Sequence, residues 1–327
     1  MNIKIYKNQS TLFGLDRGFT DLLKFLSCIL IALHHYSQYA IGEESLYNGI
    51  YYILAWQGGY IGVAIFFLLS GYGLMKSDMV NHLNLIQFVK RRVLRIYLPV
   101  VIASLIWLPI YANLWPEKYS LGELFIQALG GGNYWFLDGV MWFVWVLLLL
   151  YLTFFVYTVL RKYSKKIDLL FLIISTIIIY LFVHSQLSNI YAVSIPFFTL
   201  GVLLARYPFQ SQLLLRKGVF VMAIELVALL SLSLSLSLSL SRNSHLAIHA
   251  IANYMIIFIF LFCCSRYIIR AEIPKWIGRS SFDVYLVHHK VQMTEVALLP
   301  TVPLWHFILT SALATFAFYW IRKLLHI

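Results

Sequence analysis

Long apolar stretches alternate with short polar gaps along almost the whole chain. The apolar residues run continuously rather than at every second position, which favours helices over the strands of a membrane barrel. A helix needs about 20 apolar residues to cross the hydrocarbon of a bilayer. The pattern predicts transmembrane helices over roughly residues 22–42, 53–75, 97–113, 136–160, 168–184, 192–206, 218–240, 247–265, 279–298 and 304–321. Because the gaps are short, we expect residues 1–327 to form a single transmembrane domain.

The basic residues fall almost entirely in gaps that would face one side of a membrane. All but three of the 25 Lys and Arg residues lie there, and the exceptions are Lys118, Arg242 and Lys290. Cytoplasmic loops of membrane proteins carry an excess of basic residues, so this bias places both termini in the cytoplasm. The sequence therefore predicts an all-α, polytopic integral membrane protein with about ten transmembrane helices.

Composition excludes several other classes of protein. A chain that is 61% hydrophobic and 12% charged has too little polar surface for a soluble protein of this length. The net charge of +12 follows from the cytoplasmic loops and suits anionic lipid, whereas no basic patch adjoins a soluble module that would bind nucleic acid. The cysteines at positions 28, 263 and 264 are not spaced for disulfides or a metal, so we expect no metal site.

Lys24 and His35 are placed to act together in the first predicted helix. Eleven positions separate them, which brings both to one helical face at about 16 Å along the axis. An ionisable side chain inside the membrane is costly and is a functional candidate, and neutral imidazole is a suitable general base. The alternative is a histidine that a neighbouring backbone or hydroxyl group satisfies. His34 points about 100° away from His35 and is expected to pack.

A basic run precedes the third predicted helix. If this run is helical, Arg92 and Arg95 share a face at the i, i+3 spacing. Two guanidinium groups side by side suit the recognition of phosphate. The bias of cytoplasmic loops toward basic residues explains a basic run equally well, so both interpretations stay open.

Polar side chains also interrupt the predicted helix over residues 279–298. They are Ser280, Ser281, Asp283, His288, His289 and Lys290. Such groups are expensive to bury in a membrane unless they are paired or hydrated. Two interpretations are open. In the first, these side chains line a polar cavity that faces the first helix. In the second, the His-His-Lys group lies at the outer interface and Lys290 reaches into water. Asp138 and Glu225 are further acidic groups in the helices, and either is able to orient a histidine.

Five motifs resemble those of the membrane-bound acyltransferase 3 family, and they occur in that family's order. In chain order they are Lys24 and His35 with ten residues between them, Phe66 to Tyr72, Arg92 to Arg95 followed by Pro99, Trp142 to Tyr151, and Ile277 to His288. The first motif has Lys where Arg is commoner in the family. Longer family members carry an acidic residue in the fourth-helix motif, where this chain has Val146, Leu147 and Leu148, so no role of that carboxylate transfers here.

The resemblance implies transfer of an acyl group, usually acetyl, from cytoplasmic acetyl-CoA to a hydroxyl of a surface polysaccharide or its lipid-linked precursor. It implies no tightly bound cofactor and a place in the bacterial cytoplasmic membrane. Arg92 and Arg95 would hold the nucleotide phosphates, with Lys24 at the mouth of the donor path. His35 would accept the hydroxyl proton or become acylated itself.

The acceptor cavity is expected to involve Asp138, Ser281, Asp283 and His288. A polysaccharide exporter without acyltransferase activity is the main alternative, and N-acylation of an amino sugar is a third interpretation. His35 and the arginine pair separate these hypotheses, because an exporter needs neither an acid/base group nor a site for coenzyme A.

Overall fold

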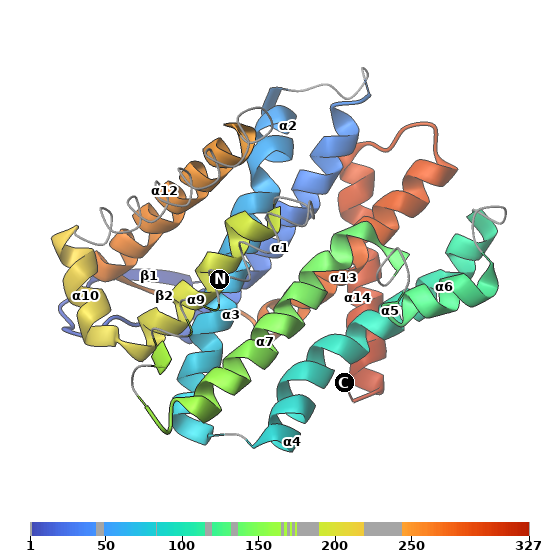
Figure 1. The fold of residues 1–327 in the computed structure, drawn as a ribbon. Helices are drawn as coiled ribbons and strands as arrows, with labels where there is room; N and C mark the ends of the chain where they lie inside the picture. The colour runs from blue at the N-terminus through green and yellow to red at the C-terminus, as the bar shows by residue number, and fades with distance from the viewer. Residues whose placement is uncertain are drawn as a thin grey trace. The chain divides into compact units, whose positions relative to one another are not determined.

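The computed structural model describes residues 2–43, 49–82, 84–114, 120–131, 137–164, 167–168, 171, 174, 190–218 and 244–326. The chain divides into two compact units. The first comprises Met1–Ser27, Gln57–His82 and Arg161–Gly278, and the second comprises Cys28–Trp56, Leu83–Leu160 and Arg279–Ile327. Each unit therefore combines three separate segments of sequence, whose elements Figure 1 labels.

Five helical segments among the described residues are long and apolar enough to cross a membrane. They are Arg17–Ala40, Gly49–Asn81, Leu85–Leu114, Gly139–Leu160 and Leu304–Leu324. Shorter apolar helical segments cover Ser194–Arg206 and Ala252–Arg266. These seven segments overlap predicted helices, which confirms the helical character of the fold in the described ranges.

The remaining predicted helices have different outcomes. The predicted helix over 218–240 and nearly all of the one over 168–184 lie outside the described residues, as does Glu225. Helix α13 (Lys275–Leu298) includes the predicted segment 279–298, but its charged side chains keep it below the hydropathy of the five spans. The number of ten spans and the cytoplasmic termini thus stay predictions.

The first unit contains a small sheet that the sequence analysis did not predict. Strand β1 (Asn2–Lys7) pairs antiparallel with β2 (Tyr267–Glu272), with Asn2 opposite Glu272 and Lys7 opposite Tyr267 (Figure 1). The Asn8 amide donates to the Arg266 carbonyl at 2.7 Å and continues the contact beyond the strands. Helices α10 (Pro208–Lys217) and α12 (Ser244–Arg266) also belong to this unit.

Two glycines allow a close crossing of helices in the first unit. Helix α3 (Gly59–Asn81) packs along α9 (Ile190–Arg206). A Cβ atom on Gly71 would collide with the Phe198 carbonyl oxygen, and one on Gly201 would collide with the carbonyl of Leu68. Small residues at such contacts bring helix backbones close together, which is how helices commonly associate in lipid.

The second unit gathers the elements that carry the candidate site. It contains most of α1 (Arg17–Ala40), α2 (Gly49–Ile53), α4 (Leu85–Phe88), the π-helical turn η3 (Val89–Val93), α5 (Leu94–Leu114), α6 (Leu121–Ala128), the 3₁₀ turn η5 (Gly139–Met141), α7 (Trp142–Leu160), nearly all of α13, and α14 (Leu304–Leu324). Helix α6 lies in the gap between the predicted helices over 97–113 and 136–160. Its start has a capping box, in which the Ser120 hydroxyl accepts from the Glu123 amide and the Glu123 carboxylate accepts from the Ser120 amide.

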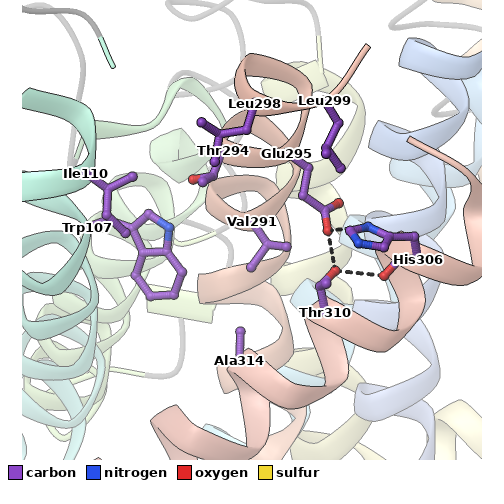
Figure 2. A pocket seen from close by; sticks show the side chains of 10 residues that line it. All are labelled: Trp107, Ile110, Val291, Thr294, Glu295, Leu298, Leu299, His306, Thr310 and Ala314. Atoms are coloured by element: carbon purple, nitrogen blue, oxygen red, sulfur yellow. Dashed lines mark hydrogen bonds and ion pairs between the residues drawn. The ribbon is translucent and has the colours of Figure 1, made fainter. Parts of the chain in front are cut away.

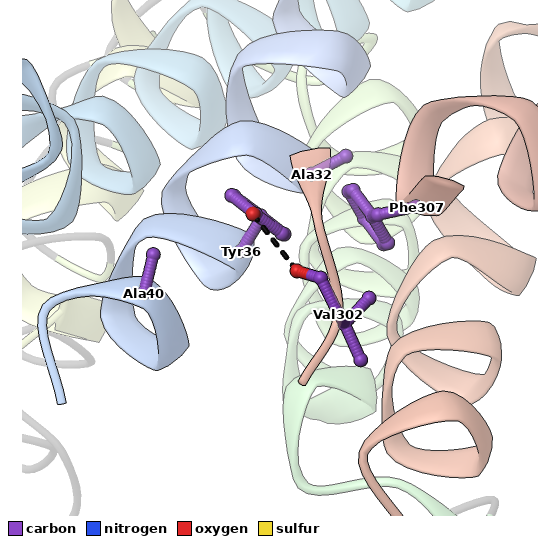
Figure 3. Packing of buried hydrophobic residues seen from close by; sticks show 5 residues of the cluster. All are labelled: Ala32, Tyr36, Ala40, Val302 and Phe307. Carbon is purple, nitrogen blue, oxygen red and sulfur yellow. Dashed lines mark hydrogen bonds between the residues drawn. The ribbon is translucent and has the colours of Figure 1, made fainter. Parts of the chain in front are cut away.

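A buried cluster fixes α1 against the connection between α13 and α14 (Figure 3). Ala32, Tyr36 and Ala40 recur every four residues on one face of α1, and they meet Val302 and Phe307. The Tyr36 hydroxyl donates to the Val302 carbonyl at 3.0 Å, and its ring stacks on Phe307 with centroids 5.2 Å apart. The cluster holds the turn of α1 that carries His35.

Candidate active site

Four histidines from two helices meet beside this cluster. The His35 ring of α1 stacks on His288 of α13 with centroids 5.5 Å apart and planes 24° apart. The His289 ring stands edge-on to His35 at 5.2 Å, and His34 adjoins His35 at 4.9 Å. The resulting group of imidazoles is inside the helical unit.

Asp138 binds the far side of this histidine group. Its Oδ1 atom accepts from Nδ1 of His289 at 2.7 Å, and its Oδ2 atom lies 3.8 Å from Nζ of Lys290. The Lys290 side chain is 0% exposed, and Asp138 is buried as well. This burial favours the interpretation in which the polar groups of α13 face the first helix, because a lysine reaching into interfacial water would be exposed.

The backbone before α7 presents the Asp138 carboxylate. Asp138 caps η5, and its Oδ1 atom also accepts from the Val140 amide at 3.0 Å. The preceding residue, Leu137, has φ of 60°, a conformation that is strained for a branched side chain. The Tyr285 hydroxyl of α13 donates to the Val140 carbonyl at 2.5 Å and joins the turn to the histidine helix.

Hydrogen bonds also fix the relation of α1 to α13. Nε2 of Gln292 donates to the His35 carbonyl at 3.0 Å. Nδ1 of His288 donates a hydrogen bond to the Tyr285 carbonyl at 2.7 Å. This bond directs the buried Nε2 atom of His288 away from that helical turn. His34 is satisfied by the Leu54 carbonyl at 2.9 Å, so it has the packing role expected of it.

The structure brings together three of the predicted site residues, namely His35, His288 and Asp138. Asp283 instead forms an ion pair with Arg322 of α14, at 2.8 Å from Oδ1 to Nε. Ser281 is buried on α13, seven residues before His288. Gln292 was not among the predicted site residues, although its position four residues after His288 on the same helix is a usable signal.

The predicted donor residues lie elsewhere on the chain. Lys24 belongs to the same α1 helix as His35, in the segment assigned to the first unit. Arg92 is half-buried in η3, and Arg95 is exposed in the first turn of α5. Among the described residues, no group of three His, Cys, Asp or Glu side chains is arranged to hold a metal ion.

The arrangement is suited to proton transfer in an apolar environment. An imidazole that faces other imidazoles, with a buried carboxylate orienting one of them, resembles the base-and-orienter pairs of acyl transfer. The chain belongs to the acyltransferase 3 family, because residues 17–323 match that family's acyltransferase domain. It is therefore a membrane protein of an acyl-transferring family. No curated protein and no solved structure matches the chain.

Proposed function

We propose that the protein transfers an acetyl group from cytoplasmic acetyl-CoA to a hydroxyl of a cell-surface polysaccharide or its lipid-linked precursor. We place this activity in the bacterial cytoplasmic membrane. The observation that carries the proposal is the stack of His35 on His288 next to the Asp138–His289 pair. Together with membership of an acyltransferase family, these groups supply an acid/base site within the membrane.

In this proposal His35 is the general base. Nδ1 of His35 lies 3.2 Å from Oε1 of Gln38, so Nε2 is the atom proposed to take the proton of the acceptor hydroxyl. The hydroxyl oxygen meanwhile attacks the carbonyl carbon of the thioester. The new C–O bond forms, the C–S bond breaks, and the coenzyme A thiolate then takes the proton from the imidazolium. Asp138 acts through His289 as a positioning residue, because its carboxylate fixes one tautomer of that ring and favours positive charge nearby.

Arg92 and Arg95 are proposed to hold the phosphates of the donor. The half-buried Arg92 and the exposed Arg95 lie at the end of the α5 segment that the basic-residue bias assigns to the cytoplasm. Guanidinium groups bind phosphate through paired, charge-assisted hydrogen bonds. Lys24 is also proposed to act on the donor, from the predicted cytoplasmic end of the helix that carries His35.

The test is to express wild type, His35→Ala and Arg95→Ala in a strain that lacks the gene, and to measure polysaccharide O-acetyl groups by NMR. We expect both variants to lose O-acetylation while the amount of exported polysaccharide stays constant. An exporter would give the opposite result, with unchanged acetyl content per sugar and altered export.

A further inference from the structure

A second candidate site lies farther along α13, in a mostly apolar cavity that carries a few polar groups and that the proposed chemistry does not use. The cavity has a volume of about 410 Å³ and is lined by residues of α5, α13, α14 and the turn after α13 (Figure 2). Its size falls within the range of about 300–1,000 Å³ that is usual for small-molecule sites. Trp107 and Ile110 of α5 form one wall, and Glu295, His306 and Thr310 lie opposite them.

The polar wall has an unused hydrogen-bond acceptor. The Glu295 Oε1 atom accepts from the Thr310 hydroxyl at 2.5 Å and lies 3.0 Å from Nδ1 of His306. Its Oε2 atom is buried without a hydrogen-bond partner, in a residue that is 7% exposed. A buried carboxylate oxygen left unpaired is costly, so this oxygen is expected to receive donors from a ligand.

The chemistry of the cavity selects among ligands. A carboxylate repels phosphate, which disfavours the phosphate groups of coenzyme A and of lipid headgroups in this cavity. An acyl chain carries no donor and would leave the Oε2 atom unsatisfied. A neutral, hydroxyl-rich molecule supplies donors to Glu295, and its apolar ring face packs on the indole of Trp107. A sugar residue has both properties.

The position of the cavity agrees with this choice. His288 and Glu295 are seven residues apart on α13, which puts them on one helical face at about 10 Å along the axis. His306 and Arg322 lie at opposite ends of α14, about 24 Å apart. The basic end of α14 is predicted to be cytoplasmic, which places the cavity toward the outer face. The histidine group then lies between the cavity and the basic end of α14.

We infer that the cavity lined by Trp107, Glu295, His306 and Thr310 binds a sugar residue of the acceptor and presents it to the histidine group. The inference rests on the proposed function and names where its acceptor binds. Glu295 receives hydrogen bonds from sugar hydroxyls through Oε2, Thr310 and His306 hold the carboxylate in position, and Trp107 supports the ring.

The experiment compares Glu295→Gln, Thr310→Val and Trp107→Ala with Glu272→Gln in the gene-deletion strain. Glu272→Gln makes the same chemical change on an exposed residue of β2. Polysaccharide O-acetyl content is measured by NMR, and the affinity of each purified protein for acetyl-CoA is measured by calorimetry. We expect at least a tenfold loss of acetylation in Glu295→Gln and Trp107→Ala, a smaller loss in Thr310→Val, and acetyl-CoA affinities within twofold of wild type.

The outcomes separate the two proposals. If wild type restores no O-acetyl groups to the deletion strain, the proposed function itself fails. If wild type restores them and Glu295→Gln does so equally well, the acceptor site is refuted. A parallel loss of acetylation and acetyl-CoA affinity would assign the cavity to the donor, and loss in Leu298→Ala but not in Glu295→Gln would assign it to a lipid chain. Thermal melting of each purified variant identifies misfolding. If Glu295→Gln or Trp107→Ala does not fold, the single variants Thr310→Val and Trp107→Phe are used in its place.

Discussion

Replacing Asp138 with Asn tests the buried charge pair on which the site depends. The substitution keeps the size of the side chain and removes its charge, which leaves Lys290 buried beside a neutral amide. Two unit charges 3.8 Å apart attract by about 4 kcal/mol at an effective dielectric constant of about 20. Breaking a buried pair typically costs about 3–5 kcal/mol. We therefore expect Asp138→Asn to lower the free energy of unfolding by about 3–4 kcal/mol.

The assay is thermal melting of the purified protein in detergent, as a double-mutant cycle with Lys290→Met. We expect Asp138→Asn to melt about 5–10 °C below wild type. The double variant should recover much of this loss, because it also removes the buried ammonium that attracts Asp138. Its acetylation should stay low, since His289 has still lost the carboxylate that orients its ring.

A matched control is Asp78→Asn, which removes a carboxylate 4.0 Å from Arg161 in a pair whose side chains are 14% exposed. A partly exposed pair of this kind is worth about 1 kcal/mol or less, so the melting temperature should change little. The buried charge pair is refuted as a source of stability if Asp138→Asn melts at the same temperature as wild type. It is also refuted if the double variant loses as much stability as the two single variants added together.

Three further predictions concern packing and the donor site. Gly71→Val should destabilise the protein by about 2 kcal/mol or more, because its side chain would meet the α9 backbone, whereas Gly73→Val, with open space around it, should not. Equal melting temperatures for these two variants would contradict the close helix crossing. Tyr36→Phe should cost about 1 kcal/mol through loss of the hydrogen bond to Val302, and a change below about 0.3 kcal/mol in chemical unfolding would contradict this role. Arg95→Ala should weaken acetyl-CoA binding about tenfold in calorimetry without altering the melting temperature, and unchanged binding would remove Arg95 from the donor site.

Features that depend on local pattern were accessible from the sequence. The apolar run of residues 22–42 predicted a helix, and α1 spans Arg17–Ala40, with Lys24 and His35 on one continuous element. The α-helical i, i+3 geometry assumed for Arg92 and Arg95 does not cover both residues, because the π-helical turn η3 ends between them and changes the helical phase. No residue type in that run distinguishes a π turn from an α turn.

Features that depend on distant contacts were not accessible. The sequence offered both Asp138 and Glu225 as partners for a histidine, and the pairing of Asp138 with His289 joins residues 151 positions apart. Asp283 was grouped with the cavity residues because it shares a helix with His288, yet its partner Arg322 lies on the next helix. Strands β1 and β2 were not predicted for the same reason, since their pairing joins residues 260 to 270 positions apart, from Lys7 with Tyr267 to Asn2 with Glu272.

The central claim is that His35 catalyses transfer from acetyl-CoA to a sugar hydroxyl. The most direct measurement supplies purified protein with acetyl-CoA and oligosaccharide prepared from the host polysaccharide by mild base deacetylation. Free thiol and new acetyl ester are then quantified together. We predict one thiol released per ester formed by wild type, and a loss of both of at least a hundredfold in His35→Ala, within the range of about 10²–10⁴-fold for a general base. Equal rates for wild type and His35→Ala, or no ester formed by wild type, would contradict the account.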